Sequence, residues 1–470
     1  MTLSKEYWKE QAAHCQPALL DDLAPLIAIE SVRDDAAATP EAPFGPGPAA
    51  ALDYMLSLAE KDGFETKNID NVAGVIRYGE GEKILGLLAH LDVVPATGQW
   101  DSPAYEATVR NGRLYGRGTS DDKGPAMACY YALKLLRDSG VTPNCQIHLI
   151  LGTDEESEWR CMHRYFATEP MPDMAFSPDA DFPLINGEKG VFDLPVHYLS
   201  EGPENGDDGS LLSFGGGIRS NVVPEHAYAR LLTDRTDAIA EAWSAFLAES
   251  SATGLAEEDD DILTLICDGH SAHGMEPQVG LNAATTLAAF LMRYDLGGAN
   301  AFLRFLGETL HEDFYGERLG IAAHDDVMGN VTVNPGIIDY EAGTGEVLLN
   351  IRYPRSTSFE AILDTLNARA AGWQLRLKEA KNVKAVHYVP DDDPLVQTLL
   401  DVYTEHTGKA AAPASIGGVT YAHVIPRGVA YGMTMPDSDV VIHQPNESLI
   451  LADLEAATAI FADAIYRLVK

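Results

Sequence analysis

Basic side chains are scarce in this sequence. Lysine and arginine together number 33 against 71 aspartates and glutamates, so the formal net charge is -38 at pH 7 over 470 residues. A charge of this sign repels the phosphates of nucleic acids and the surfaces of anionic membranes, and it favours solubility. We therefore expect neither nucleic acid nor membrane as a partner.

Cysteines are also few, and long apolar runs are missing. The 5 cysteines are odd in number and none forms a C-x-x-C pair, which argues against a disulfide framework and against a structural zinc site. No stretch reaches the roughly 18 uninterrupted apolar residues that a membrane-spanning helix needs. Charged residues also interrupt the apolar runs near the N-terminus. We expect a cytoplasmic protein.

Two common catalytic motifs are absent. The stretch GRGTSDDKGP, residues 116–125, has no glycine directly before Lys123 and no Ser or Thr after it, which excludes a P-loop. The sequence G-x-S-x-G does not occur, which argues against a serine hydrolase with a nucleophile elbow. The adjacent carboxylates of Asp121 and Asp122 instead favour a cation, because a cation relieves the repulsion between them.

The order of the expected elements indicates an α/β fold. Short apolar runs at residues 84–91 and 146–151 are typical of strands that are buried on both faces. Between them, residues 124–139 carry apolar side chains at helical spacing. A strand, a loop, a helix and a strand in this order predict an α/β sheet with ligands at the carboxyl ends of its strands.

A change in sequence texture predicts a second domain inside the first. Strand-like segments alternate with glycine-rich turns over residues 188–381, which favours a separate α+β domain. Residues 382–470 contain a strand-like run at 439–442 and a final amphipathic helix at 451–469, but no core of their own. They should return to complete a first domain over residues 1–187, so that residues 188–381 form an insertion.

Histidine and carboxylate side chains follow the strand-like runs. His90 and Asp92 lie at the end of the first run, and in a strand both side chains point to one face. The motif TDEES, residues 153–157, follows the second run with three consecutive carboxylates. Each motif has a structural alternative: a histidine at a strand end for the first, and acids at a helix N-terminus for the second.

Further motifs favour a cation over these structural alternatives. SPDADFP adds Asp179 and Asp181, and HQPNE begins with His443 after the run at 439–442. A cleft that collects all these carboxylates needs a positive partner. A histidine and carboxylate set without cysteine suits zinc, manganese or cobalt in a catalytic site that is open to water. Two such ions sharing one carboxylate would polarise a carbonyl and activate water, which predicts hydrolysis.

The motifs together resemble those of one metallopeptidase family. HLDVVP, GRGTSDDKGP, TDEES, SPDADFPLINGEKG, SAHG and HQPNE occur in this order between about residues 90 and 447. They are similar to the motifs of the family that includes aminoacylase, carboxypeptidase G, succinyl-diaminopimelate desuccinylase and the peptidase V type of dipeptidase, and resemble the peptidase V branch most. The resemblance implies a zinc-peptidase-like catalytic domain with a mixed sheet flanked by helices, an inserted α+β lid domain and two divalent metal ions.

The resemblance also implies the metal ligands. By the family's D-x-K-G pattern, Asp121 would bridge both ions and would be joined to Asp122 by a cis peptide bond. The remaining ligands, two for each ion, would be His90 with Asp179 and Glu156 with His443. The ions would be zinc, with manganese and cobalt as alternatives.

The same resemblance implies the residues that assist the metal ligands. Glu155 would be the general base, and Asp92 would orient the imidazole of His90. Two positions depart from the family pattern. Glu158 stands where many relatives have glycine, and His423 stands where peptidase V relatives have arginine, which affects substrate recognition.

Three residues of the insertion resemble lid residues of the peptidase V type: Asn221, His273 and Arg352. There they would bind the substrate carboxylate and stabilise the tetrahedral oxyanion, with His273 of the SAHG motif as the oxyanion donor. Taken singly, each is more often structural. The length of the insertion resembles the enlarged lid of this type, which implies a monomer.

The expected function is therefore that of a dipeptidase acting on small peptides with free N- and C-termini. An N-acyl amino acid deacylase or desuccinylase is the alternative, because the same metal core would serve it. A non-catalytic binding protein on this scaffold would lack the base or a ligand, whereas the sequence retains Glu155 and every expected ligand.

Overall fold

The computed structural model describes residues 3–200 and 205–470. The chain divides into two compact units. Unit 1 comprises Met1–Gly187, His387–Ser415 and Val419–Lys470, and unit 2 comprises Glu188–Val386 and Ile416–Gly418. The catalytic and lid roles of the two units stay predictions.

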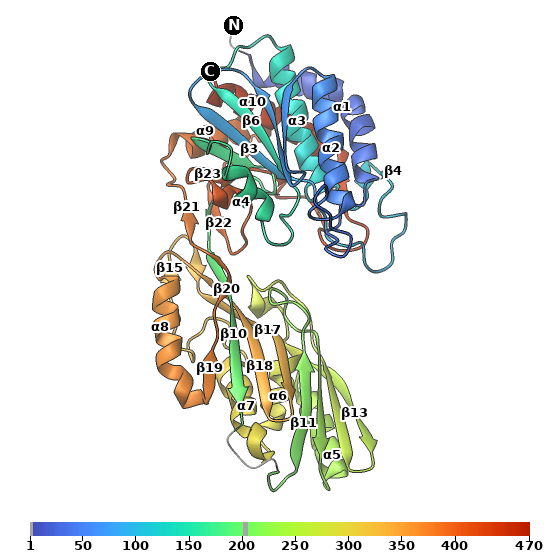
Figure 1. Cartoon of the computed structure of the whole chain (residues 1–470), viewed down its shortest axis with the longest axis vertical. Coiled ribbons are helices and arrows are strands. Elements are labelled where there is room, and N and C mark those ends of the chain that lie inside the picture. Colours follow the sequence, from blue (N-terminus) through green and yellow to red (C-terminus); the bar gives the residue numbers. More distant parts are fainter. Residues whose placement is uncertain (1–2, 201–204) are drawn as a thin grey trace. The chain divides into compact units, whose positions relative to one another are not determined.

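Unit 1 is built on a mixed sheet, which Figure 1 shows with helices packed against it. In spatial order the strands are β1 (Glu65–Ile69), β2 (Ala73–Tyr78), β6 (Gln146–Gly152), β3 (Ile84–His90), β7 (Met174–Ser177), β23 (Gly428–Ala430), β9 (Ile185–Glu188) and β21 (His387–Tyr388), with β22 (Ala414–Ile416) paired to β9. β3 runs parallel to β6 and β7, whereas β1, β2 and β6 pair antiparallel. The mixed sheet expected from the sequence is confirmed.

Helices cover both faces of this sheet. Their bounds are α1 (Lys5–Ile27), α2 (Pro46–Lys61), α3 (Lys123–Asp138), α4 (Arg160–Phe166), α9 (Pro394–Thr407) and α10 (Leu451–Leu468). Leu87 of β3 packs into a core shared with α1, α3 and α10, whereas its neighbour Leu88 packs on the opposite face beside Tyr165 of α4. Since successive strand residues point to opposite faces, a strand between two cores must be apolar throughout. This explains the apolar run that predicted β3.

The parallel pairing aligns the ends of three strands. β3 and β6 pair in register from Ile84 with Gln146 to His90 with Gly152, and Leu87 of β3 pairs with Phe176 of β7. The residues that follow His90, Gly152 and Ser177 therefore leave the sheet at one edge. This is the edge at which the sequence placed the ligands.

Smaller strands lie beside the main sheet of unit 1. One set contains β25 (Ser448–Ile450), β5 (Arg113–Tyr115) and β4 (Thr108–Arg110), and another contains β24 (Met433–Thr434) and β8 (Ala180–Asp181). The prediction of a strand at 439–442 is wrong, because those residues pair with no strand. The next strand in this part of the chain, β25, begins only at Ser448. Val441 and Ile442 are 42% and 48% exposed, so their apolar character does not reflect burial in a sheet.

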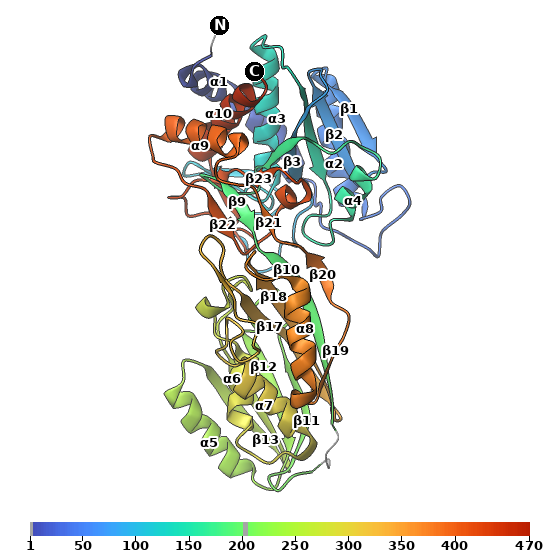
Figure 2. The same ribbon diagram turned by 90° about the vertical axis from the view of Figure 1, so that its left-hand side faces the viewer.

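Unit 2 contains an antiparallel sheet with helices packed against it (Figure 2). In spatial order the strands are β13 (Thr253–Asp259), β14 (Ile262–Asp268), β12 (His226–Leu232), β11 (Ser210–Gly216), β17 (Thr332–Glu341), β18 (Thr344–Tyr353), β10 (Gly190–Leu199) and β19 (Leu375–Leu377), with β20 (Lys381–Lys384) paired to β10. The helices are α5 (Thr236–Glu249), α6 (Ala283–Leu291), α7 (Asn300–Arg304) and α8 (Phe359–Ala370), and β15 (His324–Asp325) pairs with β16 (Gly329–Asn330). Their apolar side chains form a core separate from those of unit 1.

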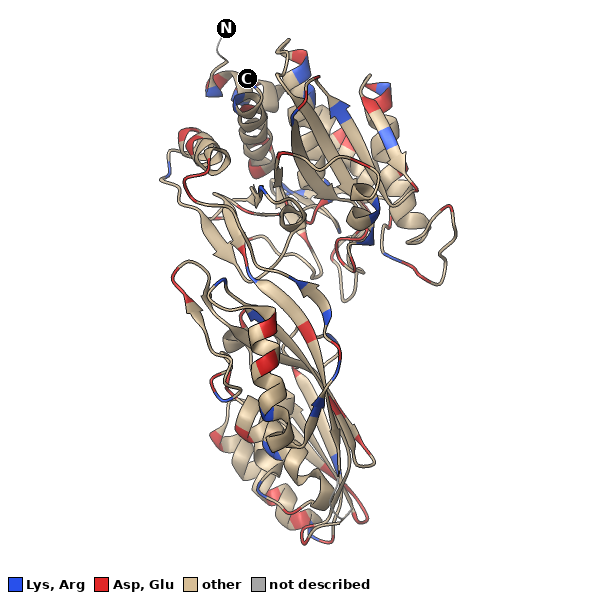
Figure 3. Cartoon of the chain, turned by 60° about the vertical axis from the view of Figure 1, so that its left-hand side comes forward, with Lys and Arg blue, Asp and Glu red and all other residues tan. Residues whose placement is uncertain are grey.

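The acidic side chains are distributed over helices, strands and loops of both units, as Figure 3 shows. The large negative charge therefore does not come from a single acidic segment. Within residues 3–200 and 205–470, no helix combines the length and the apolar character needed to cross a membrane.

Candidate metal centre

The aligned strand ends bring the predicted ligands of unit 1 together. His90 ends β3, Glu155 and Glu156 follow β6, and Asp179 follows β7. Asp121 lies in the loop just before α3. These residues come from four separate segments and gather around His90.

Asp121 lies between two imidazoles. Its Oδ1 is 3.0 Å from Nε2 of His90, and its Oδ2 is 2.8 Å from Nε2 of His443. One carboxylate thus offers one oxygen to each histidine. This is the arrangement that a carboxylate bridging two cations requires.

Two further carboxylates complete the surroundings of these histidines. Oε1 of Glu156 lies 3.0 Å from Nε2 of His443, and Oδ2 of Asp179 lies 3.7 Å from Nε2 of His90. Possible ligand atoms of His90, Asp121 and Glu156 lie within 4.8 Å of one another, and so do those of His90, Glu155 and Asp179. The neighbours of each histidine agree with the ligand pairs that the resemblance implied. Their roles stay predictions.

The site carries more negative charge than its histidines balance. Burial lowers the pKa of His443, but hydrogen bonds to Asp121 and Glu156 outweigh this and raise it to about 11. Burial raises the pKa of Asp179 well above its ordinary value, and repulsion from Asp122 and Asp121 adds to the effect. Burial and repulsion from Asp121 likewise raise the pKa of Glu156. The raised pKa values of Asp179 and Glu156 reflect burial and negative charge that the two imidazoles do not fully offset.

Divalent cations fit this donor set. Imidazole nitrogens and carboxylate oxygens without cysteine are the ligands of catalytic zinc, manganese and cobalt sites. A cation between Asp121 and each histidine would supply the positive charge that the raised carboxylate pKa values call for. The groups are consistent with divalent metal ions.

Asp92 contacts both the His90 ring and the backbone of the TDEES loop. Its backbone oxygen lies 3.0 Å from Nδ1 of His90, and its Oδ1 lies 3.5 Å from the same nitrogen. Its two carboxylate oxygens also accept the backbone N–H groups of Glu155 and Glu156, each at 3.1 Å. The resemblance implied the contact with His90. The contacts with the Glu155 and Glu156 backbone were not expected from the sequence.

Asp122 turns away from the two histidine side chains. The peptide bond between Asp121 and Asp122 is cis, as the resemblance implied. The Oδ2 of Asp122 accepts the backbone N–H of His90 at 2.9 Å, and its side chain is fully buried. Burial raises the pKa of Asp122 well above its ordinary value. The second aspartate of the pair therefore supports the backbone of a predicted ligand.

The departure at Glu158 has a local explanation. Arg33 donates to Asp154 at 2.9 Å and to Glu158 at 2.8 Å. The extra carboxylate is thus paired with a cation that also reaches the residue before Glu155. A glycine at this position would leave that part of the Arg33 guanidinium without this partner.

His423 lies in an aromatic cluster behind the TDEES loop. Its ring is 6.4 Å from Trp159 and 5.4 Å from His387, measured between ring centroids. The indole N–H of Trp159 donates to the backbone oxygen of Glu155 at 2.8 Å.

The ring of Tyr421 packs 6.2 Å from the ring of His90, measured between centroids. Tyr421 fits there only because residue 152 is glycine, where a Cβ would lie 2.3 Å from the Tyr421 hydroxyl.

Two of the predicted lid residues lie side by side in unit 2. The backbone N–H of Gly274 donates to the oxygen of Asn221 at 2.7 Å, and Val222 pairs with His273 in an isolated bridge. Nδ1 of His273 accepts the backbone N–H of Met275 at 3.2 Å. In the neutral ring the proton is therefore on Nε2. His273 is exposed, and its role as the oxyanion donor stays a prediction.

Arg352 is held by a chain of buried side chains. Its Nε donates to Oδ1 of Asn350 at 3.0 Å, and Nδ2 of Asn350 donates to Oδ1 of Asp193 at 2.8 Å. Nη1 of Arg352 donates to the backbone oxygen of Gly417 at 2.5 Å. Burial lowers the pKa of Arg352 to about 10. Sequence reasoning missed Asn350, although its spacing of two from Arg352 in a strand places both on one face.

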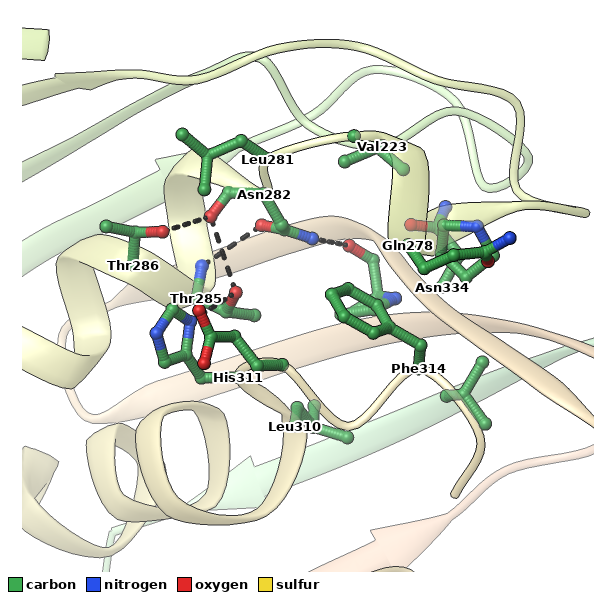
Figure 4. A pocket seen from close by; sticks show the side chains of 15 residues that line it. Val223, Gln278, Leu281, Asn282, Thr285, Thr286, Leu310, His311, Phe314 and Asn334 are labelled. Carbon is green, nitrogen blue, oxygen red and sulfur yellow. Dashed lines mark hydrogen bonds between the residues drawn. The ribbon is translucent and has the colours of Figure 1, made fainter. Parts of the chain in front are cut away.

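Asn334 fixes the loop that carries Asn221. Its Nδ2 donates to the backbone oxygens of Ser220 and Val222, at 2.7 and 3.0 Å, one on each side of Asn221. Asn334 also lines a cavity of about 210 Å³ next to the N-terminus of α6 (Figure 4). The cavity is lined mainly by neutral side chains and supplies no further predicted site residue.

The fold, the edge of the sheet and the donor set together define a hydrolase of the metallopeptidase class. Residues 86–467 match the family described as Peptidase family M20/M25/M40, and the chain belongs to this family. The resemblance drawn from the motifs is confirmed.

Two close relatives come from Staphylococcus aureus. The proteins of strains bovine RF122 / ET3-1 and USA300 are both named "Putative dipeptidase", and each is 43% identical over 467 residues. In each case the match covers 98% of this chain and 99% of the relative.

Solved structures share the fold at low sequence identity. Human carnosine dipeptidase 1 superposes with a TM-score of 0.59 at 13% identity, covering 100% of this chain and 99% of that one. Aminoacylhistidine dipeptidase from Vibrio alginolyticus gives a TM-score of 0.58 at 12% identity, with 96% of both chains covered.

Removal of metal should lower both stability and activity. We expect prolonged chelation to abolish hydrolysis and to lower the thermal unfolding temperature, because ions that bind only the folded state stabilise it. Adding zinc, manganese or cobalt should restore both quantities, which calorimetry and a peptide-hydrolysis assay would measure. Full activity in a preparation shown to be free of metal would contradict the metal centre.

Proposed function

We propose that the protein is a metal-dependent dipeptidase that cleaves the peptide bond of dipeptides with free N- and C-termini. The observation that carries this proposal is the position of Asp121, with one oxygen directed to each of His90 and His443. The printed names of the relatives and the family's description support the choice of a peptide substrate.

Two divalent cations bound at this centre, zinc in our proposal with manganese or cobalt as alternatives, would polarise the substrate carbonyl and lower the pKa of water. Glu155 would accept a proton from the attacking water and pass it to the leaving amine. Its backbone is fixed on both sides, by Asp92 at the N–H and by Trp159 at the oxygen. Its carboxylate lies within 4.8 Å of possible ligand atoms of His90 and Asp179.

The residues of unit 2 would bind the substrate and its transition state. The Nε2–H of His273 would donate to the oxyanion that forms on the attacked carbonyl. Arg352 would bind the C-terminal carboxylate of the substrate, with Asn221 as a further polar contact. Among the described residues, Arg352 has hydrogen bonds to neutral oxygens but no ion pair, and a substrate carboxylate would supply the missing anion.

We further propose that the protein acts as a monomer in the cytoplasm. Cys15 is half-buried and the other four cysteines are buried, and all five are free thiols, which suits a reducing compartment. The long second unit supports a site completed within one chain. Light scattering of the purified protein checks this, and a stable dimer at low concentration would contradict it.

Glu155→Gln should nearly abolish turnover. A neutral amide cannot accept the proton of water, so we expect kcat to fall by about 10²- to 10⁴-fold while metal content, measured by elemental analysis, stays unchanged. Glu158→Gln is the matched control in the same loop, because its side chain is 55% exposed and should affect kcat little. A Glu155→Gln variant that keeps more than about a tenth of the wild-type rate would contradict the base role.

A substrate panel separates the dipeptidase from the deacylase alternative. Dipeptides, dipeptide amides and acetyl- or succinyl-amino acids should be compared by kcat/KM, and we expect dipeptides to be preferred. Arg352→Ala should raise KM for dipeptides by about 10-fold or more, because a charge-assisted bond to the carboxylate is lost. The same variant should leave dipeptide amides nearly unchanged. Preference for the acylated amino acids would favour the deacylase.

His273→Ala tests the oxyanion donor. We expect kcat to fall by about 10²- to 10³-fold with metal content unchanged, as for the loss of other oxyanion donors. His270→Ala is the control, since His270 lies in the same loop and pairs through its backbone with Leu281. If His273→Ala keeps its kcat, or if it loses metal instead, the oxyanion role is wrong.

A further inference from the structure

Glu447 ends the HQPNE motif and has no part in the proposed reaction, yet its carboxylate is completely buried. Its Oε1 accepts three backbone N–H groups, from Gly118 at 3.0 Å, Ser120 at 2.9 Å and Asp121 at 3.2 Å. Its Oε2 accepts Nη1 of Arg117 at 2.6 Å. One side chain therefore collects four donors from the loop that carries Asp121.

The loop is shaped to present these donors. Backbone N–H groups that converge on one oxygen form a concave anion site, and their bonds to a carboxylate are stronger than bonds between neutral groups. Gly118 has φ +87°, a conformation that favours glycine, and a Cβ there would lie 2.9 Å from Cδ of Lys123. The Arg117 side chain is 1% exposed and balances the buried charge of Glu447.

Glu447 also joins the two segments that approach each other at the metal centre. It lies four residues after His443, and Asp121 is the last of its three backbone donors. The same segments are attached at two further points, from Gly116 N–H to Glu447 O at 3.1 Å and from the Ser120 hydroxyl to Ser448 O at 3.0 Å. The contact of 2.8 Å between Asp121 and His443 forms beside this attachment.

We propose that Glu447 is a positioning residue for the metal centre, which holds the backbone of Asp121 against the His443 segment so that both side chains can bind one cation. The inference rests on the proposed metal-dependent function, because it concerns the geometry of the same centre. Groups that orient metal ligands typically change metal affinity by about 10- to 100-fold when they are mutated.

The chain offers a matched control. Glu169 is also buried and also pairs with an arginine at 2.6 Å, Arg77, but its other partner is Lys67 and it touches none of the predicted ligands. Glu447→Gln and Glu169→Gln each remove the charge from a buried ion pair. Both should lower the unfolding temperature, whereas only Glu447→Gln should weaken metal binding.

The test measures the zinc dissociation constant of metal-free protein by competition with a chromophoric chelator. We expect Glu447→Gln to bind zinc about 10- to 100-fold more weakly than wild type and Glu169→Gln to bind within about twofold. The visible spectrum of the cobalt-loaded protein should change in the Glu447 variant alone, since it reports the ligand geometry.

A second pair of variants keeps the test decisive if Glu447→Gln does not fold. Arg117→Lys retains a cation for Glu447 and should bind zinc more tightly than Arg117→Gln. Equal zinc affinity of wild type and Arg117→Gln would overturn the positioning role while leaving the metal centre intact, and so would equal affinity of wild type and a folded Glu447→Gln. A wild-type protein that binds no divalent cation would overturn the metal centre itself and this inference with it.

Discussion

The metal centre depends on the parallel pairing of β3 with β6 and β7. Parallel strands end at one edge of a sheet, so residues distant in the sequence leave the sheet together there. His90, the TDEES loop and Asp179 are neighbours for this reason. An antiparallel β3 would place His90 at the opposite edge, and no rearrangement of loops of this length would restore the cluster. The apolar cores on both faces of β3 bury this strand in the interior of the sheet.

Charge balance is the second requirement of the site. Folding gathers several carboxylates around only two imidazoles, at a cost that burial increases. Asp121 reduces this cost by serving both histidines at once. The remaining imbalance favours bound cations on physical grounds, independently of any likeness to other proteins. Ions that bind only the folded state would stabilise this fold in addition to its cores.

Sequence patterns predicted those parts of the molecule that follow local rules. The helix expected at 124–139 runs over Lys123–Asp138, because apolar spacing and strand order are local properties. The predicted ligands lie close together, as their positions after strands suggested. The strand expected before His443 is absent, because residues 439–442 have no strand to pair with. An apolar run in the sequence does not reveal whether a pairing partner exists. The hydrogen bonds from Arg352 to Asn350 and from Asn350 to Asp193 link the strands β18 and β10. No single segment of the sequence contains both strands, so this chain of contacts could not be predicted locally.

Asp92 couples the positions of two neighbouring site residues, Glu155 and Glu156. Because one carboxylate grips the adjacent amides of Glu155 and Glu156, the proposed proton acceptor and the proposed ligand cannot shift independently. A displacement of the loop would disturb both together. A lineage that gave up catalysis but kept the metal as a structural element could do so by exchanging the Glu155 side chain, with the backbone of the loop left in place. Metal binding would then persist without proton transfer after the exchange of one side chain.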